Sequence, residues 1–142
     1  MTKDVLLYIK GLQFEGEHDA SDVEIVTPAE YYEKNGSHYV MYEEATEGFE
    51  EKIKNIIKWN GHTLELTKRG LVNVHMMFEE KKKNLTDYRT PFGSILVGID
   101  TKKIWIQEED TRILVNVDYA LEINYEHLSD CKISMKVQAK EE

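Results

Sequence analysis

The strictest constraint in this sequence is a two-residue alternation of apolar and polar side chains near its C-terminal end. Between residues 113 and 124, the apolar positions are Ile113, Val115, Val117, Tyr119, Leu121 and Ile123, and the intervening ones are Leu114, Asn116, Asp118, Ala120, Glu122 and Asn124. Successive side chains of a β-strand point to opposite faces, so this pattern predicts a strand with one face on a core. A helix has 3.6 residues per turn and would scatter the same apolar side chains around its axis.

Shorter segments repeat this alternation between turn signals. Asn35-Gly36 and Asn60-Gly61 are two-residue hairpin signals, because both residues of such a turn accept a positive φ. Strands are predicted over about 4–16, 23–34, 38–44, 53–59, 62–67, 72–78, 95–99, 104–106, 113–124 and 127–139, with an interruption of the second at Pro28. The segment Ala45–Glu51 is open between a short helical turn and a loop. The chain therefore reads as nine or ten antiparallel strands with little or no helix.

One hexapeptide, Tyr88-Arg89-Thr90-Pro91-Phe92-Gly93, breaks the alternation. Proline cannot donate to a sheet ladder, and glycine inside a strand pattern marks a bulge or a bend. We interpret this stretch as the corner of a curved sheet, and Asp100–Lys103 as a turn. Regularly spaced strands that alternate on one face are typical of an up-and-down barrel or a sandwich, and the bend favours the barrel. The expected fold is an all-β antiparallel barrel that occupies residues 1–142 as a single domain.

Charge and composition narrow the classes of partner. The 142 residues carry 27 acidic and 18 basic side chains, a net charge of −9, which disfavours binding to nucleic acid and to anionic membranes. No apolar run reaches the length of a membrane span, and no N-terminal signal pattern is visible, so a cytoplasmic protein is expected. The single Cys131 excludes a disulfide framework within the chain. No cofactor motif is present, and the five histidines are too scattered to predict a metal site.

Several segments of the chain resemble one known family. They are Tyr39–Glu44, Lys68–Gly70, Val72–Glu79, Tyr88–Gly93, Thr101–Lys103 and Tyr119–Asn124. Together these segments resemble the YwiB-like family of small bacterial proteins of unknown function, which have a lipocalin-like, calycin-type barrel. The resemblance extends over most of the chain and implies a closed barrel. It implies no activity, substrate or catalytic residue, and Tyr125 departs from it where a glycine would suit a hairpin turn better.

Candidate ligand-binding residues come from the bends and from the aromatic side chains. Arg69 and Arg89 flank predicted turns, where a barrel collects its loops, and a guanidinium matches the fork of a carboxylate or a phosphate. Aromatic side chains with a polar atom are common in barrel ligand sites. The candidate set is Arg69, Tyr88, Arg89, Thr90, Tyr42 and Trp105. The alternative is that the arginines pair with nearby acids and that the aromatic residues fill the core.

Two functions of different classes follow. The first is a non-enzymatic barrel that binds a small, partly apolar or anionic ligand. The second is a protein–protein interaction module that uses an edge strand or an open barrel face. An enzyme built on Arg89 and a neighbouring carboxylate is the weaker alternative, and no cofactor is expected. Apolar residues on both strand faces at Leu6-Leu7 and Ile56-Ile57 leave a homodimer open.

Overall fold

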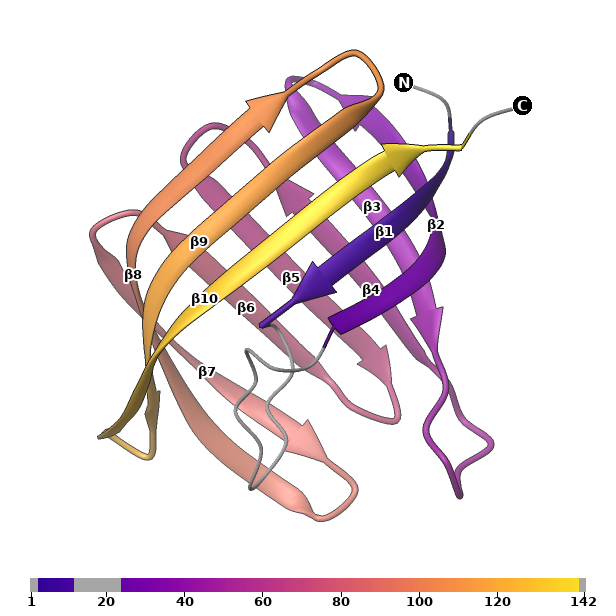
Figure 1. The fold of residues 1–142 in the computed structure, drawn as a ribbon. Coiled ribbons are helices and arrows are strands. Elements are labelled where there is room, and N and C mark those ends of the chain that lie inside the picture. Colours follow the sequence, from indigo (N-terminus) through magenta and orange to yellow (C-terminus); the bar gives the residue numbers. More distant parts are fainter. Residues whose placement is uncertain (1–2, 12–23, 141–142) are drawn as a thin grey trace.

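The computed structural model describes residues 3–11 and 24–140, and these form one antiparallel sheet of ten strands (Figure 1). The strands are β1 (Asp4–Lys10), β2 (Glu24–Lys34), β3 (Ser37–Glu44), β4 (Ile53–Trp59), β5 (Thr63–Gly70), β6 (Val74–Glu79), β7 (Lys82–Thr90), β8 (Gly93–Glu108), β9 (Arg112–Ile123) and β10 (Glu126–Ala139). Their order in the sheet is β6-β5-β4-β3-β2-β1-β10-β9-β8-β7. The expected all-β antiparallel barrel is confirmed.

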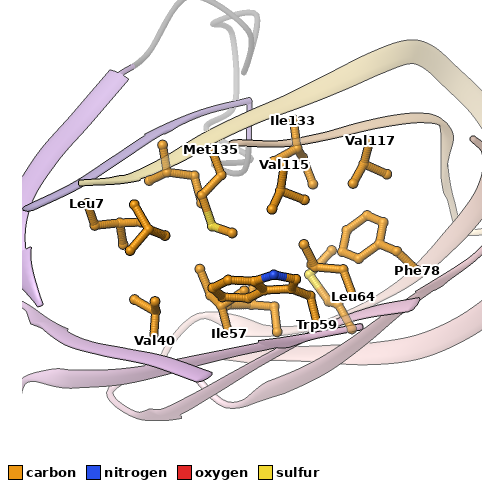
Figure 2. Packing of buried hydrophobic residues seen from close by; sticks show 14 of the residues in the cluster. Leu7, Val40, Ile57, Trp59, Leu64, Phe78, Val115, Val117, Ile133 and Met135 are labelled. Carbon is orange, nitrogen blue, oxygen red and sulfur yellow. The ribbon is translucent and has the colours of Figure 1, made fainter. Parts of the chain in front are cut away.

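The alternating side chains face the barrel interior as the pattern predicts. On β9, Ile113, Val115 and Val117 are buried, and on β1 the same holds for Val5, Leu7 and Ile9. These side chains meet those of β3 to β6 from the opposite wall in one contiguous cluster, in which Trp59 and Phe78 are the bulky members (Figure 2). The barrel is therefore held together by a shared apolar interior.

The barrel closes between β6 and β7, the two ends of the sheet. A single bridge joins Asn73, just before β6, to Arg89 of β7, with reciprocal N–H···O distances of 3.0 Å. At the other end of β6, the Lys81 N–H donates to the Thr101 carbonyl at 2.9 Å. The Glu80 carboxylate there accepts the Ile104 N–H at 3.2 Å. This seam has few backbone bonds, and the barrel is nearly closed.

Four local predictions were wrong. The predicted two-residue turn at Asn60-Gly61 is a three-residue connection, Asn60-Gly61-His62, in which neither Asn60 nor Gly61 has a positive φ. Pro91 and Phe92 form the short loop of a hairpin between β7 and β8, whereas the sequence suggested a corner within a sheet. The predicted turn at Asp100–Lys103 is instead a bulge, through which β8 continues to Glu108. The predicted interruption at Pro28 is absent, because β2 is continuous. A bulge, a turn and an edge proline use the same residue types, so the local sequence does not separate them.

Other local predictions can be settled for the described residues. The Asn35-Gly36 hairpin is confirmed, with φ angles of 52° and 79°. Asn124 and Tyr125 make the β9–β10 turn with φ angles of 48° and 71°, so the turn forms without the glycine. Ala45–Glu51 contains no helix and is a loop. The predicted extension of the first strand beyond Gly11 lies outside the described residues.

Candidate ligand-binding site

The barrel wall parts between β2 and β3. The ladder between these strands ends at the pair Glu30–Met41. Beyond it, β2 continues to Glu24 alongside β1, and β3 continues to Glu44 alongside β4. In the described part of the chain, the β2 segment Glu24–Ala29 thus has no partner on its β3 side, and Figure 1 shows the two strands diverging.

Pro28 accounts for the end of this ladder. The Tyr31 N–H points to β1, since it donates to the Lys3 carbonyl at 2.7 Å. Because N–H directions alternate along a strand, position 28 faces β3. Proline has no N–H to offer there, and its ring disfavours further pairing on that side. The proline therefore lies on an open edge of the wall, where it leaves no donor unpaired.

A groove of about 530 Å³ lies over this parting. Its apolar lining comes from Pro28, Ala29, Met41, Tyr42 and Ile56, and Asn55 is also part of the lining. Charged side chains of Asp4, Glu30, Glu43, Lys54 and Lys140 surround it. Ala29, Tyr42 and Asn55 belong to the buried, inward-facing positions of their strands. The floor of the groove is thus formed by residues of the barrel interior.

Behind this floor lies a polar cluster formed by Glu44, Asn55 and Lys68, here called the Lys68 cluster. Lys68 Nζ donates to Glu44 Oε1 at 2.6 Å and to Asn55 Oδ1 at 2.9 Å. Asn55 Nδ2 donates to the same Glu44 oxygen at 3.0 Å. The three side chains come from adjacent strands β3, β4 and β5, and Asn55 and Lys68 are buried. Buried charges are stable when they are paired and hydrogen-bonded in this way.

Tyr42 lies beside this cluster, two residues before Glu44 on the same face of β3. Burial, together with the Glu44 carboxylate, raises the pKa of Tyr42 well above its ordinary value. The phenol therefore keeps its proton at neutral pH and can act as a hydrogen-bond donor or acceptor. The site combines an apolar groove, a neutral hydroxyl, an amide and a buried ammonium.

A second groove, of about 960 Å³, opens at the barrel end that holds the β2–β3 hairpin. Within the barrel at this end, the Tyr31 hydroxyl and His38 Nδ1 are 2.6 Å apart, and the His38 ring stacks on Trp59 with a 5.3 Å centroid distance. His38 Nε2 is 3.9 Å from a carboxylate oxygen of both Glu33 and Glu108. The charged lining is mainly acidic, which suits a partly apolar ligand less well than the β2–β3 groove.

The structure brings two of the candidate residues together on the outer surface. Arg69 is the residue before the last of β5. It follows Lys68, which pairs with Val74, and Arg89 pairs with Asn73. Both arginine side chains are exposed, and within the described residues neither has an ion-pair partner. They flank Asn73 at the barrel seam, outside the wall that encloses the Lys68 cluster.

The remaining candidates are spread over the barrel. Tyr88 is half-buried against the core. The Thr90 hydroxyl is 2.9 Å from the Gly93 carbonyl and 3.1 Å from the Phe92 N–H, which stabilises the hairpin loop. Trp105 is 42% exposed on the outer face, with Lys103 Nζ 5.0 Å from its ring centroid. Of the candidate set, Tyr42 is the residue that lines the β2–β3 groove.

The Lys68 cluster was missed by the sequence reasoning, although a signal exists. Lys68 follows Leu64 and Leu66 at the inward positions of β5, and Asn55 lies between inward Ile53 and Ile57 on β4. A polar residue in the apolar phase of an alternating strand is therefore the mark of this cluster. The contact between its members depends on the pairing of β3, β4 and β5, which the alternation does not reveal.

The comparisons with known proteins now identify the family. Residues 7–135 match the model of the family described as Domain of unknown function (DUF1934). The chain belongs to this family. The DUF1934 chain is also similar in structure to the ywiB protein from Bacillus subtilis, with a TM-score of 0.76 and 18% identity over 98% of this chain and 93% of that one. The resemblance to the YwiB-like family and its barrel is thus confirmed, while a search of curated proteins gave no match.

The described residues contain neither a group of potential metal ligands nor a helix that could span a membrane. Within residues 3–11 and 24–140, no three or more His, Cys, Asp or Glu side chains are grouped so that they could hold a metal ion. In the same ranges, no helix has the length and apolar character to cross a membrane.

Proposed function

We propose that this chain is a non-enzymatic barrel that binds a small, partly apolar ligand in the β2–β3 groove. The observation that carries the proposal is the parted wall, which sets an apolar groove of about 530 Å³ over the inward-facing Tyr42 and Asn55. Ligand sites in proteins combine a mainly apolar lining with a few polar groups that fix orientation. The groove has both components, and its size falls within the range of small-molecule sites.

Native mass spectrometry of gently purified protein, followed by organic extraction, tests this proposal. A small molecule bound in a 1:1 ratio is expected. Ile56→Glu places a charge in the lining and should abolish the adduct, whereas Trp105→Glu, on a distant part of the outer surface, should retain it. A bare protein mass for the wild type, or an adduct that survives both substitutions, would count against the groove as the site.

The second candidate function is binding of a protein partner, and the same parting of the wall favours it. The β3-facing edge of Glu24–Ala29 is unpaired among the described residues, and Val26 on it is 54% exposed. An extended peptide can add to such an edge through backbone hydrogen bonds. A homodimer formed by this edge is one version, and light scattering tests it. A concentration-independent monomer mass for the wild type would exclude the homodimer.

A further inference from the structure

The two charged members of the Lys68 cluster, Lys68 and Glu44, differ in their exposure to solvent. The Lys68 side chain is 8% exposed and the Glu44 side chain is 23% exposed. Lys68 follows the inward Leu64 and Leu66, and its ammonium is also held by Asn55 Oδ1 at 2.9 Å. Glu44 is the last residue of β3 and is followed directly by a loop. The carboxylate can therefore rotate to solvent, while the ammonium stays inside the barrel.

Asn55 connects this cluster with the groove. It lines the groove, and its side chain contacts both charged members of the cluster. Tyr42 lines the groove from the adjacent strand, and its hydroxyl is kept neutral next to Glu44. Lys68 does not itself line the groove, so a polar head group would pass between these two side chains to reach it. The apolar part of the same molecule then remains in the groove between β2 and β3.

We propose that Glu44 occupies the position that the carboxylate of a ligand takes on Lys68. This inference rests on the proposed function, because it assigns the ligand class of the same groove. The ligand is a monocarboxylic acid with an alkyl or aryl tail. Its carboxylate replaces that of Glu44 as the acceptor for Lys68 Nζ and Asn55 Nδ2, two donors that the structure already directs to one carboxylate oxygen.

The charge of the cluster selects a monoanion. Lys68 and Glu44 sum to zero, and exchange of one carboxylate for another keeps that sum unchanged inside the barrel. A dianion such as a phosphate monoester would add a buried negative charge without a partner, which is costly. A cationic head group would meet the Lys68 ammonium, and a neutral one would leave that ammonium without a counter-charge once Glu44 had moved. Glu44 thus competes with the ligand for Lys68.

Binding of three amphiphiles with the same ten-carbon tail tests the inference. Decanoate and decyltrimethylammonium below their micelle concentrations, and decanol below its solubility limit, are titrated by calorimetry at constant salt into the wild type, Glu44→Gln and Glu43→Gln. Glu43→Gln is the matched control, because Glu43 borders the groove from the outer face. It reports the effect of removing a nearby negative charge that does not contact Lys68. Glutamine at position 44 retains a carbonyl acceptor for Lys68, so the variant is expected to fold.

The expected result is that decanoate binds the wild type more tightly than the other two probes. Glu44→Gln should strengthen decanoate binding at least tenfold and leave decanol binding unchanged, while Glu43→Gln should change decanoate binding less than threefold. An equal increase in decanoate affinity in the two variants, or no increase in Glu44→Gln, would overturn the displacement of Glu44. The groove would still stand as a binding site. Absence of binding by all three probes would overturn this inference and the proposed function together.

Discussion

Lys68 Nζ and Glu44 Oε1 are 2.6 Å apart inside a barrel whose other inward side chains are almost all apolar. Loss of Glu44 leaves the buried Lys68 ammonium without its counter-charge, so Glu44→Leu is expected to lower the free energy of unfolding by about 3 kcal/mol. Simultaneous replacement of all three members, as Lys68→Met, Asn55→Leu and Glu44→Leu, should restore stability to within about 1 kcal/mol of the wild type. Urea denaturation measures both values, and a triple variant no more stable than Glu44→Leu would contradict this account.

Gly70 lies where two backbone segments approach closely. A Cβ at this position would lie 2.1 Å from the Lys52 carbonyl oxygen, and its φ is +130°. Gly70→Ala is therefore expected to destabilise the barrel by about 2–5 kcal/mol through strain and displacement of β4. Gly48→Ala is the matched control, because its φ is +88° but no atom lies within 4 Å of the added Cβ. Gly48→Ala should lower the free energy of unfolding by about 1 kcal/mol. Equal losses of stability in the two variants, measured by thermal unfolding, would contradict the steric explanation.

The raised pKa of Tyr31 predicts that the protein loses stability at alkaline pH. Burial, with smaller contributions from Glu33 and Glu108, raises the pKa of Tyr31 from 10.0 to about 12. The folded protein therefore binds this proton more tightly than the unfolded chain, and the resulting stabilisation is complete below pH 10 and is lost between pH 10 and 12. The free energy of unfolding should fall over this range, with a shallower slope in Tyr31→Phe. Identical slopes for the two proteins would show that Tyr31 is not responsible.

Substitution of the two tryptophans should have very different effects on the free energy of unfolding. Trp59 is fully buried, so Trp59→Ala is expected to lower the free energy of unfolding by about 3–5 kcal/mol. Trp105 is 42% exposed, and Trp105→Ala should change the free energy of unfolding by no more than about 0.5 kcal/mol. Single-tryptophan variants made with phenylalanine allow a second check by acrylamide quenching. Strong quenching of the protein that retains only Trp59 would contradict its place in the core.

The barrel could be predicted from the sequence because its strongest signals are local. Alternation at Ile113–Ile123 decides which side chains are buried, and Asn35-Gly36 decides where a hairpin turns. The strand β7 was not predicted, since its side chains are all exposed or half-buried and show no apolar phase. Without β7, the loop at Pro91-Phe92 looked like a bend in one strand and not the loop of a hairpin.

The site was less predictable, because it depends on contacts between strands. Pro28 is visible in the sequence, but the side of β2 that it blocks follows from the pairing of Tyr31 with Lys3. Lys68 and Asn55 lie in the apolar phase of their strands, and that signal could have marked them as buried. Their contact with Glu44 requires the register of three strands. Arg69 and Arg89 were chosen for their position at bends, and the structure places them together but on the outer surface.

The most direct test of the β2–β3 groove is paramagnetic NMR with decanoate that carries a nitroxide at the end of its tail. Broadening of amide signals that is strongest at Ala29, Tyr42 and Asn55 and clearly weaker at His38 and Glu108 is the result that this account predicts. Ascorbate reduction of the nitroxide should restore the signals. Broadening centred on Tyr31, His38 and Glu108, or none at all, would contradict ligand binding in the β2–β3 groove.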